Sequence, residues 1–326
     1  MTALLWKPLL ASSLPMDQET GDFRWDLIVF PVWASPKLDG YRAMVQRGVL
    51  TSRGGLAVAN RELQRRYGRK DLEGLDGELC TGRPTAANVF NATSRVVRKA
   101  EVDASTTALY VIDFVPDKSG GGPVGHKFIY DDLDFASRHL QLLRRVETDP
   151  TRWGVNIIPI KQHLIKTLDK LKTFERECLR QGYEGVMLRR GDQGAYPQKD
   201  GKENRSTLKE FDLVRLKRFE YEEATILAVH PLMHNTNEER TATGKRATKK
   251  AGMVEDKTRV GSATLKDLKT GVEFDTTIGA EALRSWIGWK RPELWRGKTV
   301  RYKYQVVGTL EKPRINTCDF AGLTEG

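Results

Sequence analysis

Short apolar runs alternate with polar segments along the first 218 residues of the chain. Runs bounded by turn residues predict strands. They lie at residues 31–34, 43–45, 49–51, 75–79, 109–115, 155–160, 186–188 and 213–216. Apolar residues at helical spacing predict helices over residues 135–146 and 168–179. This mixture predicts an α+β region, in which Arg47-Gly48 forms the turn of a hairpin.

The pattern changes after Phe219, where short strands follow one another between polar loops. Strands are predicted at residues 224–229, 261–265, 272–276 and 300–306. This spacing is typical of a small barrel. A chain of 326 residues also exceeds the length at which one core usually keeps growing. We therefore expect two domains, residues 1–218 and residues 219–326.

One segment of the second domain, residues 235–259, is too long and too polar for an ordinary connection. Two interpretations remain open: a solvated insertion without regular structure, or an arm that becomes ordered when it clamps DNA. Its basic residues are Arg240, Lys245, Arg246, Lys249, Lys250, Lys257 and Arg259.

The composition describes a protein that can build a core and that carries excess positive charge. Hydrophobic residues make up 39% and charged residues 30% of the chain. No apolar run approaches the length needed to span a membrane, and the first residues lack the features of a signal peptide, so we expect a cytoplasmic protein. The net charge of +11 favours a polyanionic partner.

The cysteines and histidines suggest no metal centre. The three cysteines lie far apart, which argues against a disulfide framework or a zinc module. The five histidines form no ligand spacing. Any metal ion should therefore be held by carboxylates.

The most informative motif is KLDGYR at residues 37–42. Lys37 can act as an amine nucleophile, Gly40 would let the backbone turn closely around a ligand, and Arg42 can hold ribose or phosphate oxygens. We expect Lys37 to lie in a loop between strands. Alone, the motif could also be an ordinary solvated turn.

Further motifs follow in order: SRG at residues 52–54, DGEL at 76–79, YVIDF at 110–114, EGVM at 184–187 and VRLK at 214–217. Together with residues 37–42, they resemble the covalent nucleotidyltransferase superfamily, and within it the compact ATP-dependent DNA ligases of the bacteriophage type. The resemblance covers nearly the whole chain.

The resemblance implies an adenylation domain of antiparallel sheets with flanking helices over residues 1–218, followed by an all-β OB-fold barrel over residues 219–326. It implies a monomeric enzyme that seals nicks in duplex DNA through a lysyl-AMP intermediate, in DNA replication, repair or recombination. ATP would be the substrate and Mg²⁺ or Mn²⁺ the metal ion. The cell would be bacterial or phage-infected.

The resemblance also implies a role for each motif residue. Lys37 would form the covalent bond to AMP, Glu78 would bind the ribose hydroxyl, and Arg53 would bind the terminal phosphate of the nick. Arg215 and Lys217 would meet the α-phosphate. The implied nucleotide-binding residues are Ser35, Pro36, Arg42, Arg53, Glu78, Ile112, Arg215 and Lys217; the metal ligands are Glu184, Asp39 and Glu78; and the DNA-binding residues are Arg53, Lys245, Arg246, Lys249, Lys250, Lys312 and Arg314.

Two positions depart from the family pattern. Ile112 stands where the family usually has an aromatic residue that stacks on adenine, and Arg215 stands where lysine is common. Strand alternation would place Tyr110, Ile112 and Phe114 on one face, so each can contact the base or belong to the core.

Other choices stay open at this point. Asp39 and Asp76 can position Lys37 or a metal-bound water, or can simply form turns beside a glycine. The alternative functions are an RNA ligase, an mRNA-capping guanylyltransferase or a non-catalytic nucleic-acid-binding module.

Overall fold

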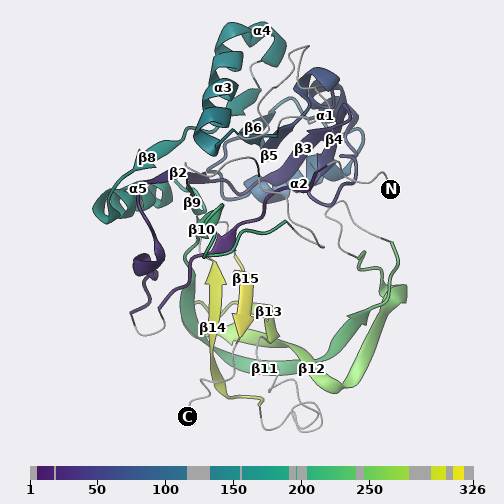
Figure 1. The fold of residues 1–326 in the computed structure, drawn as a ribbon. Helices are drawn as coiled ribbons and strands as arrows, with labels where there is room; N and C mark the ends of the chain where they lie inside the picture. Colours follow the sequence, from purple (N-terminus) through teal and green to yellow (C-terminus); the bar gives the residue numbers. More distant parts are fainter. Residues whose placement is uncertain are drawn as a thin grey trace. The chain divides into compact units, whose positions relative to one another are not determined.

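The structure is a computed structural model that describes residues 6–17, 20–115, 133–154, 156–190, 196, 204–239, 246–278, 295–305 and 311–318. The chain divides after Lys217 into two compact units (Figure 1). Within the described residues, no helix is both long enough and apolar enough to cross a membrane.

The first sheet of the first unit has the strand order β1-β10-β9-β2-β8. Its neighbours are antiparallel except for β1 and β10, which run parallel. Helix α5 packs on it through the buried side chains of Leu171 and Cys178. The elements are β1 (Ser12–Ser13), β2 (Val32–Lys37), β8 (His163–Ile165), β9 (Gly185–Arg189), β10 (Val214–Leu216), α5 (Leu168–Arg180) and the short 3-10 helix η1 (Trp25–Leu27).

The second sheet has the order β4-β3-β5-β6-β7, and its core includes Leu63 and Tyr67 of α1 and Val96 and Val97 of α2. The sequence pattern had predicted neither of these helices. The elements are β3 (Tyr41–Gln46), β4 (Val49–Ser52), β5 (Leu75–Thr81), β6 (Thr107–Phe114), β7 (Ile157–Pro159), α1 (Arg61–Tyr67), α2 (Val89–Arg98), α3 (Phe135–Thr148), α4 (Pro150–Trp153) and η2 (Lys70–Leu72).

The predicted hairpin at Arg47-Gly48 is present as the β3–β4 connection. Both residues have positive φ, 55° and 68°, which is the geometry that a two-residue hairpin turn with matching twist requires. The side chain of Glu73 stabilises the turn by accepting hydrogen bonds from the backbone N–H groups of Arg47 (2.8 Å) and Gly48 (2.9 Å).

A β-bulge in β6 overturns one expectation. Asp76 pairs with Asp113 and Gly77 with Val111, so Ile112 is the extra residue of the ladder. Because a bulge shifts the alternation by one residue, Phe114 falls on the side of Val111 and belongs to the core of the second sheet. The prediction that Phe114 shares a face with Ile112 is therefore wrong.

The second unit is a closed barrel with the strand order β11-β12-β13-β15-β14. Its core contains Phe274 and Tyr302, and the Tyr302 hydroxyl donates a hydrogen bond of 2.6 Å to Asp267. The elements are β11 (Glu220–Asn235), β12 (Met253–Asp267), β13 (Glu273–Ile278), β14 (Thr299–Gln305), β15 (Arg314–Cys318) and η3 (Lys250–Gly252).

Strands β11 and β12 are much longer than the sequence pattern predicted. Their ladder reaches the pair Asn235 and Met253, so residues 253–259 belong to β12 and not to a loop. In the part of the tip that the structure describes, the Asn235 side chain donates a hydrogen bond of 2.8 Å to the carbonyl of Ala247. The described part of this segment is thus a hairpin.

Candidate active site

Lys37 is the last residue of β2, not a loop residue as predicted. It pairs across the ladder with Gly185 of β9, so the preceding residue, Glu184, lies beside the lysine. A Cβ atom on Gly185 would lie 2.0 Å from the carbonyl oxygen of Leu216. Only glycine therefore lets the start of β9 approach β10 this closely.

Glu184 holds two lysines at once. One carboxylate oxygen forms an ion pair with the Lys37 amine, and the other lies 2.7 Å from Lys217 Nζ. Burial acts to raise the pKa of Glu184, but the two lysines overcome this effect and lower the pKa to about 2. Burial lowers the pKa of the Lys217 amine, although Glu184 opposes the shift. Glu184 is thus an ionised carboxylate that pairs with two amines.

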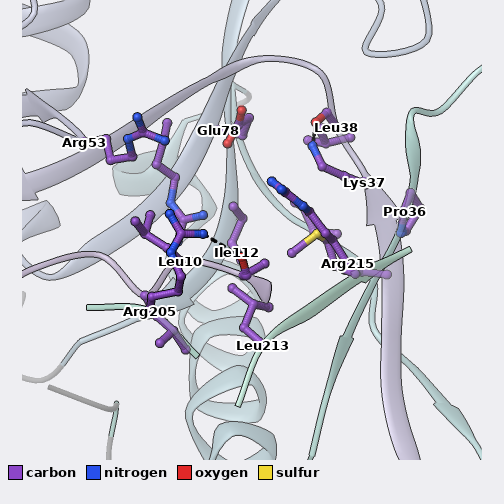
Figure 2. Close-up of a pocket in the computed structure, with 16 residues that line it drawn as sticks. Leu10, Pro36, Lys37, Leu38, Arg53, Glu78, Ile112, Arg205, Leu213 and Arg215 are labelled. Carbon is purple, nitrogen blue, oxygen red and sulfur yellow. Dashed lines mark hydrogen bonds between the residues drawn. The ribbon is translucent and has the colours of Figure 1, made fainter. Parts of the chain in front are cut away.

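A cavity of about 260 Å³ opens in front of Lys37 (Figure 2). Besides Lys37, most of the predicted nucleotide-binding residues line it, namely Ser35, Pro36, Arg42, Arg53, Glu78, Ile112 and Arg215. Glu184 and Lys217 are not among the lining residues; Glu184 contacts Lys37, which lines the cavity, and Lys217 contacts Glu184. Asp39 is buried and does not line the cavity either.

Asp76 has a function that the sequence did not indicate. It is a fully buried residue of β5, and its two oxygens accept hydrogen bonds from Arg42 Nε (2.6 Å) and Nη2 (2.7 Å). Burial opposes the charge on Arg42, but Asp76 outweighs this effect and raises the pKa of the guanidinium. Asp76 therefore orients Arg42 toward the cavity instead of contacting Lys37 or forming a turn.

Glu78 lies near Lys37 and Arg42 at the cavity wall (Figure 2). Burial raises the pKa of this carboxyl to about 7, and Arg42 and Lys37 limit the shift. Glu78 can consequently exchange a proton near neutral pH.

Of the residues considered as partners for a base, Ile112 lines the cavity, whereas Tyr110 and Phe114 do not. Ile160 and Met187 also line the cavity and complete an apolar wall. The described side of the cavity around Ile112 is therefore aliphatic.

Gly40 packs closely against β5, a contact that the sequence did not indicate. A Cβ atom at this position would lie 2.2 Å from the carbonyl oxygen of Leu79 and 2.7 Å from Cys80 Sγ. The absence of a side chain allows this packing.

The sequence analysis missed part of the cavity wall. Arg205, Leu213 and residues 9–11 line it as well. Arg205 Nη1 donates a hydrogen bond of 3.1 Å to the carbonyl of Ala11. No motif or periodicity marked these residues, since their partners lie almost 200 positions away in sequence.

The predicted DNA-binding residues of the second unit lie in two segments. Arg246 donates to the backbone carbonyls of Asn235 and Asn237 at 3.3 Å each, and Lys249 forms an ion pair with Glu239. Lys250 and Lys312 are exposed, and Arg314 is partly buried at the start of β15. Lys245 lies outside the described residues.

Comparisons with solved structures agree with this geometry. No protein-family model and no curated protein matches the chain. The chain is similar to the crystal structure of Chlorella virus DNA ligase-adenylate, with 26% identity, a TM-score of 0.52, and coverage of 98% of this chain and 99% of that one.

A structure from a study of Lig E DNA ligases matches with 20% identity and a TM-score of 0.61, over 95% of this chain and 98% of that one, and shares the fold. The resemblance that the motifs predicted is confirmed. In fold, in motif order and in the cavity where the motifs meet, the chain is similar to the compact ATP-dependent DNA ligases.

Proposed function

We propose that the protein seals nicks that carry a 5'-phosphate and a 3'-hydroxyl, in three steps that pass through a lysyl-AMP intermediate. The observation that carries the proposal is the position of Lys37. Its amine borders a cavity lined by Arg42, Arg53 and Arg215, and the buried carboxylate of Glu184 holds it there. A protein that only binds nucleic acid would not need this arrangement.

In the first step, Lys37 Nζ attacks the α-phosphorus of ATP. The amine must be neutral to attack, so Nζ loses a proton to solvent water before the P–N bond forms and the bond to pyrophosphate breaks. Glu184, ionised at neutral pH, keeps the amine at the edge of the cavity. Arg215 and Lys217 supply positive charge where negative charge develops on the α-phosphate.

The remaining lining residues would hold the nucleoside. Arg42, fixed by Asp76, and Glu78 are placed to contact the ribose, and Ile112 packs on adenine as an aliphatic surface. Ser35 and Pro36 form the neighbouring wall. In the second step AMP passes to the 5'-phosphate of the nick, which Arg53 would grip, and in the third the 3'-hydroxyl displaces AMP.

A divalent cation is compatible with this site. Within the described residues no group of three or more His, Cys, Asp or Glu side chains is arranged to hold a metal ion. Mg²⁺, however, commonly uses one or two carboxylates together with substrate phosphates and water. Glu78, in the cavity wall, and Glu184, beside Lys37, would hold Mg²⁺ or Mn²⁺, which would neutralise phosphate charge, and Asp39 stays a further candidate ligand.

The second unit is proposed to be an OB-fold domain that binds nicked duplex DNA. Its support is the closed five-stranded barrel and the basic residues Arg246, Lys249 and Lys250 near the tip of the β11–β12 hairpin. We propose that a monomer acts in DNA replication, repair or recombination.

Incubation with labelled ATP and Mg²⁺ tests the first step. Wild-type protein should form an acid-labile adenylate and pass it to nicked DNA. Lys37→Ala should form none, and Glu184→Gln should form it at least about 100-fold more slowly, because the preorganised charge is lost. An adenylate on Lys37→Ala would contradict the mechanism.

A further inference from the structure

Residues 9–13, of which residues 9–11 line the cavity, are bound to segments near the end of the first unit. Backbone hydrogen bonds join Leu10 N to Asn204 O (2.7 Å), Ser206 N to Leu10 O (2.9 Å) and Ser12 N to Leu213 O (3.1 Å). Strand β1 then pairs in parallel with β10, which carries Arg215. This stretch, which we name the N-terminal wall, thus forms one side of the nucleotide cavity.

The N-terminal wall contacts two arginines of the cavity directly. The Ser13 hydroxyl accepts a hydrogen bond of 2.9 Å from Arg215 Nε, and the Ala11 carbonyl accepts one from Arg205 Nη1. A guanidinium is a rigid planar fork of donors, so fixing one N–H sets the direction of the others. Arg215 stands where related ligases commonly have lysine. The single ammonium nitrogen of a lysine could not be held by one N–H while others point into the cavity.

A third contact reaches Arg42 through Tyr196. The buried Tyr196 hydroxyl accepts a hydrogen bond from the backbone N–H of Leu9 (2.6 Å) and donates one to Asp76 Oδ2 (2.8 Å). Asp76 in turn holds Arg42. The ring of Tyr196 packs edge-on against Trp6 with centroids 5.6 Å apart, which fixes the direction of the hydroxyl.

We infer that the N-terminal wall is a positioning element of the active site, in which Ser13 orients Arg215 and Tyr196 orients Arg42 through Asp76. The inference rests on the proposed function, because it assigns these arginines to the α-phosphate and to the ribose. Neither Ser13 nor Tyr196 belongs to a motif, and Tyr196 does not line the cavity. Both act through another side chain.

The two residues should affect self-adenylation differently. Arg215 meets charge that develops in the transition state, so Ser13→Ala should lower kcat about 3- to 10-fold and leave the KM for ATP unchanged. Ser13→Thr keeps the hydroxyl and should restore kcat. In an Arg215→Lys background Ser13→Ala should have no further effect, because the Nε donor is gone.

Arg42 would contact the ribose in ground state and transition state alike. Tyr196→Phe should therefore raise the KM for ATP about 3- to 10-fold with little change in kcat. The ring and its packing on Trp6 are retained, so the fold should be preserved.

Matched controls separate positioning from general destabilisation. Ser105→Ala removes an exposed hydroxyl that bonds Asp103 at 3.0 Å, away from the cavity. Tyr41→Phe removes a buried hydroxyl that has no hydrogen-bond partner among the described residues. Both controls should keep wild-type kcat and KM, and thermal unfolding should confirm that all variants are folded.

The inference is overturned if Ser13→Ala and Tyr196→Phe match their controls, or if the kcat of Ser13→Ala equals that of wild-type protein once it is normalised to the folded fraction. It is also overturned if Ser13→Ala still lowers kcat in the Arg215→Lys background. Failure of wild-type protein to form an adenylate would instead contradict the proposed function.

Discussion

Arg189 of β9 forms an ion pair with Asp113 of β6, and this contact joins the two sheets of the first unit. Arg138 of α3 binds the same carboxylate at 2.9 Å, and all three side chains are almost completely buried. Burial acts to raise the pKa of Asp113, but the two arginines lower it to about 2. The cluster therefore ties a helix and both sheets to one ionised carboxylate next to Ile112.

Removing this charge should destabilise the first unit strongly. Asp113→Asn removes the carboxylate charge that two buried guanidinium groups share, and breaking such a cluster typically costs about 3–5 kcal/mol of unfolding free energy. Urea unfolding followed by circular dichroism measures the loss. Asp26→Asn, which breaks an exposed ion pair with Arg24, should change the midpoint very little. Equal effects of the two substitutions would refute the importance of the cluster.

His139 should make stability depend on pH. Burial lowers the pKa of this imidazole below 6.5, Asp113 opposes the shift and Arg189 adds to it. The unfolded chain then binds more protons than the folded one below pH 6.5, so the free energy of unfolding should rise with pH and level off above about 6.5.

Urea midpoints at about pH 5.5 and about pH 7.5 measure this slope, which His139→Leu should reduce. His234→Gln, at an exposed position paired with Asp256, serves as the control and should retain the slope. A larger slope in His139→Leu than in wild-type protein would show that His139 affects the pH dependence of stability in the opposite direction.

The aliphatic wall at Ile112 should limit the affinity for ATP. Ile112→Phe introduces a ring that can stack on adenine, which is worth about 0.5–1.5 kcal/mol and corresponds to a KM about 2- to 12-fold lower. Ile112→Ala should raise the KM. Tyr110→Phe is the control, because Tyr110 does not line the cavity. If Ile112→Ala leaves the KM for ATP unchanged, the base does not lie against this residue.

The β11–β12 hairpin should contribute to DNA binding but not to adenylation. Changing Arg246, Lys249 and Lys250 to glutamine removes three positive charges, so nick binding should weaken and the slope of log affinity against log salt should become shallower by up to about 3 units. Self-adenylation should stay near the wild-type rate. Equal loss of both activities would contradict a DNA-binding role for the hairpin.

Most strands of both units could be predicted because their apolar runs are short and bounded by turn residues, although β1, β8 and β15 were missed. Helices α1 and α2 could not. In α2 the buried positions include Thr93 and Ser94, which count as polar in any hydropathy pattern, and in α1 only Leu63 and Tyr67 are buried. Tertiary packing decides the conformation of such segments.

Within the site, Lys37, Glu184 and Lys217 could be predicted because motif order implies that they meet. Phe114 was misplaced since a one-residue bulge leaves no mark in the apolar pattern. Ser13 and Tyr196 were missed because their hydrogen-bond partners are distant in sequence. Local periodicity carries no information about such contacts.

Lys217 ends the first unit and Arg218 begins the second, so the boundary lies one peptide bond from an amine that binds Glu184. Strand β10 ends at Leu216, so the ladder of the first sheet holds the Lys217 backbone on one side. Glu184 holds the residue at its amine. The position of one catalytic charge is thus set by the end of a strand and by the carboxylate that it meets.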